Sequence, residues 1–284
     1  MGKLDGQVAI VTGASRSIGK GCALELGAAG ATVYATGRTL KEGDAALPGS
    51  LEATAREVDA LGGRGIGVVC DHRDDAQVAA LFERVANECG RLDVLVNNAF
   101  LIPPELVSGL PFWETPLSNW DDMIDVGTRS AYAATWHAAR PMVAGKRGLI
   151  VNISSSGAVG FAWHVAYGVG KCALDRITAD TAHQLREHGV AVVSLWPGLV
   201  YNERLQQVPN VEQMFDISGA ESPRFCGRAV TALAGDTEVL QLSGSAVSAR
   251  ELADKYGFTD VDGRLPKGPL SHSARADAAG ESES

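Results

Sequence analysis

The sequence predicts a single-domain α/β protein with a doubly wound parallel sheet of about seven strands and helices on both faces. Short, almost wholly apolar runs alternate along the chain with stretches whose apolar residues recur at helical spacing. The first run, 8–11, passes through a glycine turn into a helix, as at the start of a nucleotide-binding βαβ unit. The chain has 284 residues, 45% of them hydrophobic, which favours one large core over two small ones.

The elements follow from these patterns in chain order. Strands are expected at residues 8–11, 32–36, 65–69, 92–96, 148–153, 190–196 and 242–246. Helices are expected at residues 18–29, 51–61, 75–89, 120–142, 167–188 and 222–234. Strands that are continuous in apolar residues, as at 148–153, are typical of sheets buried on both faces. The alternation predicts a Rossmann-like fold, in which ligands bind at the carboxyl ends of the strands.

The fold is expected to occupy residues 1–265, with a cofactor half at about 5–150 and a catalytic and substrate half at about 150–265. The connection 101–119 contains four prolines and is expected to pack over an edge of the fold or to contribute to the substrate mouth. Residues 201–218 should form a substrate-side loop with a short helix. Residues 266–284, rich in Ser, Ala, Gly and charge, are expected to be a mobile tail.

Composition excludes several classes of function. A formal net charge of −9 argues against nucleic acid or an anionic membrane surface as the main partner. The sequence has no uncharged apolar run of the roughly 18 residues that a membrane helix needs, and no secretory signal at its start. The five cysteines have no metal-ligand spacing and are odd in number. We therefore expect a reduced, cytoplasmic protein without a metal site.

The glycine turn after the first strand is a candidate cofactor site. A helix N-terminus presents unpaired N–H groups and a positive dipole end, which favour a pyrophosphate, and glycine lets the backbone come close to it. The alternative is a turn that only connects a strand to a helix. The candidate contacts are Gly13, Ser15, Arg16, Ser17, Ile18 and Gly19.

The end of the second strand indicates which dinucleotide would bind. Gly37 supplies no carboxylate for a ribose 2′-hydroxyl, whereas Arg38, with help from Arg16, offers a planar fork suited to a 2′-phosphate. NADP(H) is therefore preferred, with NAD(H) possible, unless both arginines are ordinary solvated side chains. Asp71, after the third strand, either accepts a hydrogen bond from the adenine amino group or caps the helix that starts near Asp75.

Tyr167 and Lys171 lie four residues apart, which puts them on one face of a helix. A free tyrosine has a pKa of about 10, and a neighbouring ammonium lowers that pKa by favouring the phenolate. The pair is thus a candidate acid–base centre. The alternative is an amphipathic helix that carries Tyr and Lys at this spacing by chance.

The ordered motifs resemble those of the short-chain dehydrogenase/reductase family over roughly residues 5–250. In the family, these motifs are a Thr-Gly-x-x-x-Gly-x-Gly turn, an Asn-Asn-Ala-Gly stretch and a Ser…Tyr-x-x-x-Lys active site. Similar stretches occur here in the same order. Three further stretches resemble one branch of that family, dehydrogenase/reductase member 1: Phe112-Trp113-Glu114-Thr115-Pro116, Ser194-Leu195-Trp196-Pro197-Gly198 and 256–264.

The resemblance assigns roles to residues of this chain. It implies that Ser155 orients a substrate carbonyl, that Tyr167 gives a proton to its oxygen, and that Lys171 lowers the pKa of Tyr167 and binds the nicotinamide ribose. Ser155 lies twelve residues before Tyr167, and the more usual spacing of thirteen would select Ser154 instead. The same resemblance places further residues against the cofactor, namely Asn98 at the ribose and Pro197, Gly198 and Val200 at the nicotinamide.

Three residues depart from the family pattern. Ser17 replaces the middle glycine of the cofactor turn, and Phe100 follows Asn98-Ala99 where the family usually has glycine. Gly127 stands where a helix asparagine usually completes a Ser-Tyr-Lys-Asn tetrad. We expect water bonded to backbone carbonyls to link Lys171 to solvent instead.

The resulting hypothesis is an NADP(H)-dependent oxidoreductase that reversibly reduces an apolar ketone, an aldehyde or a steroid-like carbonyl. The alternative is a cofactor-binding scaffold or redox sensor with little turnover. Phe161, Trp163 and Tyr201 are expected near the substrate mouth. His164, three residues before Tyr167, either touches substrate or, as is more usual for a histidine, lies on the surface. The resemblance also implies a homodimer or homotetramer built on the helices at 120–142 and 167–188.

Overall fold

The computed structural model describes residues 2–269, which contain one sheet of seven parallel strands in the order β3-β2-β1-β4-β5-β6-β7. The strands are β1 Val8–Thr12, β2 Thr32–Gly37, β3 Arg64–Val69, β4 Val94–Asn97, β5 Gly148–Ile153, β6 Val190–Trp196 and β7 Ala246–Ser248. The order reverses between β1 and β4, which is where doubly wound sheets bind ligands. The predicted fold class is confirmed.

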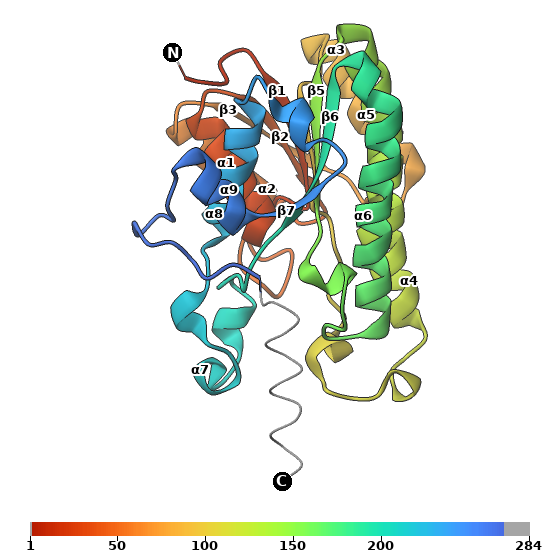
Figure 1. Cartoon of the computed structure of the whole chain (residues 1–284), viewed down its shortest axis with the longest axis vertical. Coiled ribbons are helices and arrows are strands. Elements are labelled where there is room, and N and C mark those ends of the chain that lie inside the picture. Colours follow the sequence, from red (N-terminus) through yellow and green to blue (C-terminus); the bar gives the residue numbers. More distant parts are fainter. Residues whose placement is uncertain (1, 270–284) are drawn as a thin grey trace.

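Helices cover both faces of the sheet (Figure 1). They are α1 Ser17–Ala28, α2 Leu51–Ala60, α3 Asp75–Cys89, α4 Ser118–Ile124, α5 Ser130–Gly145, α6 Val165–Leu185, α7 Val211–Met214, α8 Pro223–Ala234 and α9 Ala249–Tyr256. Side chains of α1, α2, α8 and α9 share one buried core with the sheet. Those of α3, α5 and α6 share another. The sheet thus lies between two apolar layers.

Strand β1 shows why the apolar runs predicted strands correctly. All five of its residues are buried, and successive side chains point to opposite faces. Val8 and Ile10 enter the core with α3, α5 and α6, whereas Ala9 and Val11 enter the core with α1 and α8. A continuous apolar run is therefore required here, because both faces of the strand are covered.

Helices α1 and α8 pack at very short range through glycine. A Cβ at Gly21 would lie 2.1 Å from the Pro223 carbonyl oxygen, and one at Gly227 would lie 2.3 Å from the Gly21 carbonyl oxygen. Glu25 stabilises the same contact between the two helices, because its carboxylate pairs with Arg224 at 2.6 Å. The two helices can approach so closely only because neither carries a side chain at the crossing.

The helix expected at 120–142 is interrupted. A π-helical turn, Asp125–Arg129, separates α4 from α5, and the Ser130 backbone N–H donates to the Asp125 carbonyl. The Ser130 hydroxyl donates to the Val126 carbonyl at 2.5 Å, a second bond across the same turn. Gly127 lies within this turn.

Two elements near the end of the described chain differ from expectation. The short strand expected near 242–246 is present but lies later in the chain: Val239–Leu242 is a 3-10 turn, and β7 occupies Ala246–Ser248. Helix α9 was not predicted. It begins with a capping box, in which the Glu251 N–H donates to the Ser248 hydroxyl while the Glu251 carboxylate accepts from the Ser248 N–H.

The start of the predicted tail lies against the substrate-side segment. Lys267 donates its backbone N–H to Gly219 and pairs with Asp216 at 2.6 Å, while Pro266 is buried. Residues 270–284 lie outside the described part, so the boundary at 265 and the mobility of the tail stay predictions. Between residues 2 and 269, no helix is both long enough and apolar enough to cross a bilayer.

Candidate active site

A cavity of about 880 Å³ opens at the carboxyl ends of the strands. It receives every sequence-predicted site residue except Gly19, which lies behind the turn. The predicted residues that line it are Gly13, Ser15, Arg16, Ser17, Ile18, Arg38, Asp71, Asn98, Ser155, Tyr167, Lys171, Pro197, Gly198 and Val200. The fold therefore gathers residues from all along the chain around one space.

The turn between β1 and α1 is built by backbone conformations that side chains resist. Gly13 has φ +65°, and a Cβ at Gly19 would lie 2.3 Å from the Gly13 carbonyl oxygen. Thr54 of α2 donates its hydroxyl to the Ala14 carbonyl at 2.9 Å, which fixes the turn from behind. The turn thus brings bare backbone to the cavity wall, as a pyrophosphate site requires.

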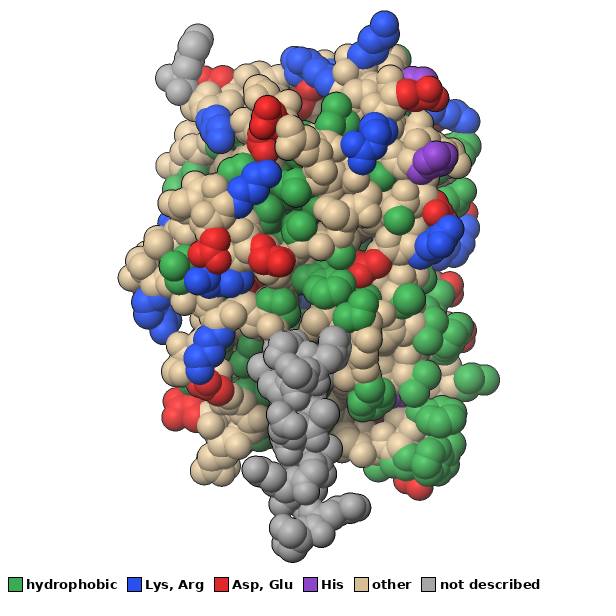
Figure 2. All heavy atoms as spheres, viewed as in Figure 1, with side chains coloured by type: hydrophobic (Ala, Val, Ile, Leu, Met, Phe, Trp, Pro, Cys, Tyr) green, Lys and Arg blue, Asp and Glu red, His purple; other side chains and the backbone are tan. Residues whose placement is uncertain are grey.

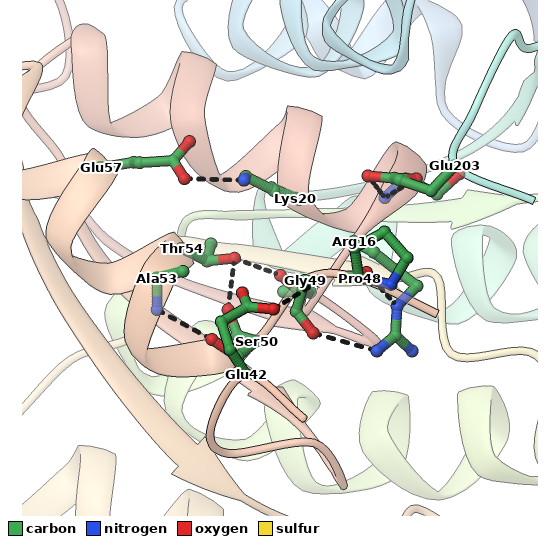
Figure 3. Close-up of polar contacts among 12 residues, drawn as sticks. Arg16, Lys20, Glu42, Pro48, Gly49, Ser50, Ala53, Thr54, Glu57 and Glu203 are labelled. Carbon is green, nitrogen blue, oxygen red and sulfur yellow. Dashed lines mark hydrogen bonds and ion pairs between the residues drawn. The ribbon is translucent and has the colours of Figure 1, made fainter. Parts of the chain in front are cut away.

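Ser17 adopts a left-handed conformation, with φ +52°. This explains why glycine is usual at its position, since a side chain here carries a conformational cost. The Ser17 backbone N–H, at the start of α1, donates to both oxygens of Glu203, and Asn202 donates its side-chain amide to the Ser17 hydroxyl at 3.0 Å. Figure 3 shows the Glu203 carboxylate at this helix end. The segment after β6 is therefore fastened to the turn.

Arg16 and Arg38 differ in their surroundings. The Arg16 guanidinium donates to the carbonyls of Leu47, Pro48 and Gly49 at 3.1, 2.9 and 3.0 Å, and Figure 3 shows it directed toward Gly49. It therefore holds this loop in place. Arg38 is exposed at the end of β2 and lines the cavity.

Asp71 lies at the cavity wall and accepts the Arg73 backbone N–H at 3.0 Å. The helix-cap alternative for Asp71 is wrong, because Asp74 caps α3 by accepting the N–H groups of Ala76 and Gln77. The neighbouring His72 is buried with its Nε2 2.8 Å from the Thr36 hydroxyl, and burial lowers its pKa to about 4. His72 is therefore neutral at physiological pH.

Asn98 joins the end of β4 to the cofactor turn. Its side-chain amide donates to the Thr12 and Gly13 carbonyls at 2.9 and 3.0 Å. Behind it, Asn97 donates to Asn152 and Asn152 donates to Thr178, both at 2.8 Å. This buried amide chain holds the ends of β4 and β5, and hence Asn98 and the serines after β5, at fixed positions.

Tyr167 and Ser155 meet inside the cavity. The Tyr167 hydroxyl donates to Ser155 Oγ at 3.0 Å, and the Gly157 backbone N–H donates to the same oxygen at 3.1 Å. Ser154 is buried instead and donates to the Lys171 carbonyl at 3.1 Å. Of the two candidate serines, the structure places Ser155 beside the phenol.

Lys171 lies one helical turn beyond Tyr167 and is 7% exposed. Its ammonium donates to the Ile153 carbonyl at 2.9 Å. Burial lowers the pKa of Lys171 to about 8, although Asp175, a turn further along α6, opposes the shift. The group is thus still largely protonated at pH 7, and it lies within 5.6 Å of the Tyr167 ring centroid.

The segment after β6 passes along the far wall. The Gly198 backbone N–H donates to Glu221 at 3.1 Å, and the Cys226 thiol donates to the other oxygen of that carboxylate at 3.1 Å. Burial raises the pKa of Glu221 to about 7. Sequence reasoning missed both Glu221 and Glu203, because their contacts depend on the path of an irregular segment.

The expected mouth residues behave differently from one another. Trp163 lines the cavity and its ring centroid lies 5.7 Å from that of Phe215, whereas Phe161 and Tyr201 do not line it. His164 is not on the surface: it is 7% exposed, accepts the Ala166 N–H at Nδ1 and so caps α6. Because Nδ1 accepts, Nε2 carries the ring proton and donates it to the Thr115 hydroxyl at 3.0 Å.

Some residues of the connection 101–119 are packed at the cavity, and others are exposed to solvent. Ile102 and Leu106 pack near Tyr167 and line the cavity. Trp113 and Leu117 are 72% and 87% exposed. Figure 2 shows hydrophobic side chains gathered over this part of the molecule, at the lower right. The segment thus supplies one wall of the cavity and an apolar surface beside it.

The residues present fit a dinucleotide. The bare turn around Gly13, the α1 N-terminus and the exposed Arg38 suit phosphates, provided that Glu203 leaves the Ser17 N–H. In the described part of the chain, His, Cys, Asp and Glu form no group of three that could hold a metal ion.

Comparisons with known proteins find relatives over most of the chain. The family described as short chain dehydrogenase matches residues 7–213. Dehydrogenase/reductase SDR family member 1 of Mus musculus is 47% identical over 93% of this chain and 86% of its own, and that of Homo sapiens is 45% identical over 95% and 88%. A metagenomic short-chain oxidoreductase in complex with NADP is 34% identical, with a TM-score of 0.70 over 87% of this chain and 97% of that one. The resemblance to that branch is confirmed.

Proposed function

The chain belongs to the short-chain dehydrogenase/reductase family, and from that premise we propose that it is an NADP(H)-dependent oxidoreductase that reversibly reduces a carbonyl to an alcohol, with Tyr167 as proton donor. The observation that carries the proposal is the Tyr167–Ser155 hydrogen bond of 3.0 Å beside the buried Lys171 ammonium, in the cavity that also contains the glycine turn.

NADPH, when bound, supplies the hydride that reaches the carbonyl carbon. Ser155 Oγ accepts from Gly157 and Tyr167, so its own proton can be donated to the carbonyl oxygen. Tyr167 then gives its phenolic proton to the same oxygen, and Lys171 stabilises the phenolate that forms. General acid catalysis of this kind contributes roughly a hundredfold to ten-thousandfold.

The cofactor would be held by residues of the first half of the chain. The turn 13–19 would receive the pyrophosphate at the start of α1, and Arg38 would pair with the 2′-phosphate. The preference for NADP(H) rests on that exposed arginine and on the carboxylate-free Gly37. A relative at 34% identity has been solved with NADP, which supports the same choice.

The substrate proposed is an apolar ketone, an aldehyde or a steroid-like carbonyl. Its side of the cavity is lined by Ile102, Leu106, Trp163, Met214 and Phe215. Asp216 and Lys267 on this wall pair with each other at 2.6 Å, so neither offers an uncompensated charge to a substrate. An apolar carbonyl compound would be selected by burial of its surface.

Two further parts of the proposal concern assembly and location. We infer a homodimer or homotetramer through α5 and α6, whose Tyr132, Trp136 and Val169 are 53%, 48% and 43% exposed. The five cysteines are unpaired, which is typical of a reducing compartment such as the cytoplasm.

The test compares the wild type with Tyr167→Phe, using Tyr256→Phe, on α9 and outside the cavity, as a matched control. NADPH and NADH binding is measured by fluorescence titration, and turnover by loss of reduced-cofactor absorbance on a panel of apolar ketones and aldehydes. Tyr167→Phe should reduce turnover at least a hundredfold while NADPH affinity stays within about twofold. Full turnover in Tyr167→Phe would refute the role of Tyr167. Binding without turnover across the panel would favour the scaffold or sensor alternative.

A further inference from the structure

The ring of Phe100 touches both members of the Tyr167–Lys171 pair. Phe100 follows Asn98-Ala99 at the end of β4, and its ring meets that of Tyr167 edge to face, with centroids 5.8 Å apart. The Lys171 ammonium lies over the Phe100 ring, 4.8 Å from its centroid. Phe100 also packs against the small apolar cluster of Leu106, Met123 and Ala166. The ring is therefore held from several sides.

Gly127 makes room for that ring. A Cβ at Gly127 would lie 2.7 Å from Cδ2 and 3.0 Å from Cε2 of Phe100. Gly127 is buried in the π-helical turn between α4 and α5, so neither the backbone nor the ring could move aside easily. The residues at 100 and 127, which sequence reasoning treated as two separate departures, thus form one contact.

We propose that Phe100 is a positioning residue that occupies the place of an amide side chain at position 127 and holds the Lys171 ammonium against Tyr167 through its aromatic face. This inference rests on the proposed function, since it concerns the same acid–base pair. A ring attracts a cation without hydrogen bonding to it, because the faces of aromatic rings carry negative potential.

Few other groups stabilise the Lys171 ammonium, so its contact with the Phe100 ring matters. The Ile153 carbonyl accepts one ammonium hydrogen, and Asp175 on the same helix is the charged group that acts on it. The elements packed around it contribute the Ser155 hydroxyl after β5, the Tyr167 phenol on α6 and the uncharged Phe100 after β4. In a site this buried, a cation–π contact is stronger than at a surface.

The consequence is a coupling between the ring and the phenolate. Without the aromatic face, the Lys171 ammonium is less stable. The state in which both Lys171 and Tyr167 are neutral is then favoured relative to the state in which ammonium and phenolate coexist. The Phe100 ring therefore favours the ionised form of the pair. The ring carries no transferable proton, so it cannot itself pass a proton between Lys171 and solvent.

The first experiment titrates Tyr167 directly, in the whole protein and without substrate. Phenolate absorbance near 295 nm is followed against pH, and the curve of the same protein carrying Tyr167→Phe is subtracted. Phe100→Leu, which keeps an apolar side chain without a ring, should move the Tyr167 titration upward by roughly half to one pH unit. Phe112→Leu, at an exposed aromatic residue outside the cavity, should leave it unchanged. An unshifted Phe100→Leu curve would overturn the proposal.

The second experiment exchanges the two residues. Gly127→Asn alone meets the ring and should disturb both the Tyr167 titration and thermal stability. Phe100→Gly together with Gly127→Asn places an amide where the ring was, and should return the titration to within about 0.3 unit of the wild type and recover most of the lost stability. A double variant no better than Gly127→Asn would show that the two positions act independently, against the proposal.

These outcomes separate the inference from the proposed function. A ring-dependent Tyr167 titration in a protein that reduces no carbonyl would support the role of Phe100 and refute the reductase. A turnover lost in Tyr167→Phe, together with a titration insensitive to Phe100→Leu, would support the reductase and refute the role of Phe100.

Discussion

The carboxylate of Glu203 accepts the backbone N–H of Ser17 through both of its oxygens, at 3.2 and 3.1 Å. This N–H belongs to the first turn of α1, where a helix presents unpaired donors and a positive dipole end. Glu203 thus places an anion where the pyrophosphate of the cofactor is proposed to bind. The negative charge of Glu203 also acts on the nearby Arg16 guanidinium.

Replacing Glu203 should therefore strengthen cofactor binding. Glu203→Gln removes the charge that competes with a phosphate, and we expect the NADPH dissociation constant to fall roughly threefold to tenfold at low salt. The measurement is a fluorescence titration, with Glu212→Gln, an exposed residue of the same segment, as the control. Weaker binding by Glu203→Gln would mean that this carboxylate helps to hold the cofactor.

Arg38 should decide between the two dinucleotides. It is exposed at the cavity, whereas Arg16 is committed to the carbonyls of the 47–49 loop. Arg38→Ala should weaken NADPH binding roughly tenfold to a hundredfold and leave NADH binding within twofold, because only NADPH carries a 2′-phosphate. Arg56→Ala, whose side chain is 69% exposed on α2, serves as the control. Equal losses for both cofactors would place Arg38 outside the phosphate site.

Glu221 should make stability depend on pH. Burial raises the pKa of its carboxyl from 4.5 to about 7, so the folded protein keeps a proton that the unfolded chain releases between these values. The contribution of Glu221 to the free energy of unfolding is therefore fully present below pH 4.5 and is lost as the pH rises through 7.

Chemical denaturation at a series of pH values tests this. Between pH 5 and 8, the free energy of unfolding of the wild type should fall by up to about 3 kcal/mol relative to Glu221→Gln, which has no charge to bury. The exposed Glu238→Gln should follow the wild type. Parallel curves for wild type and Glu221→Gln would mean that Glu221 ionises at its ordinary pKa.

Much of the fold could be predicted because buried parallel strands leave a strong pattern. The runs 148–153 and 190–196 match β5 and β6 at both ends, since every position there faces a covered layer. The capping box that starts α9 was also readable, as Ser248 followed three residues later by Glu251, and was overlooked. Tyr167 and Lys171 lie together as their spacing indicated, and beside them lies Ser155, which the resemblance selected although the usual spacing favoured Ser154.

The failures concern residues whose role depends on a distant partner. His164 resembles a surface residue in sequence, but it caps α6 and contacts Thr115, which lies 49 residues earlier. The contact of Glu203 with Ser17 spans 186 residues and follows from the path of an aperiodic segment. Local patterns carry no information on such pairs, because sequence periodicity reports only which side of an element is buried.

The contact between α1 and α8 bears on how the protein is made. Arg224 of α8 pairs with Glu25 of α1 across 199 residues of sequence. At a synthesis rate of about 5 to 20 residues per second, a nascent chain would expose the outer face of α1 for roughly 10 to 40 s before α8 is translated. The cofactor turn begins that helix, so it cannot gain its full support until most of the chain has left the ribosome. The proposed dinucleotide would then bind well only to completed molecules.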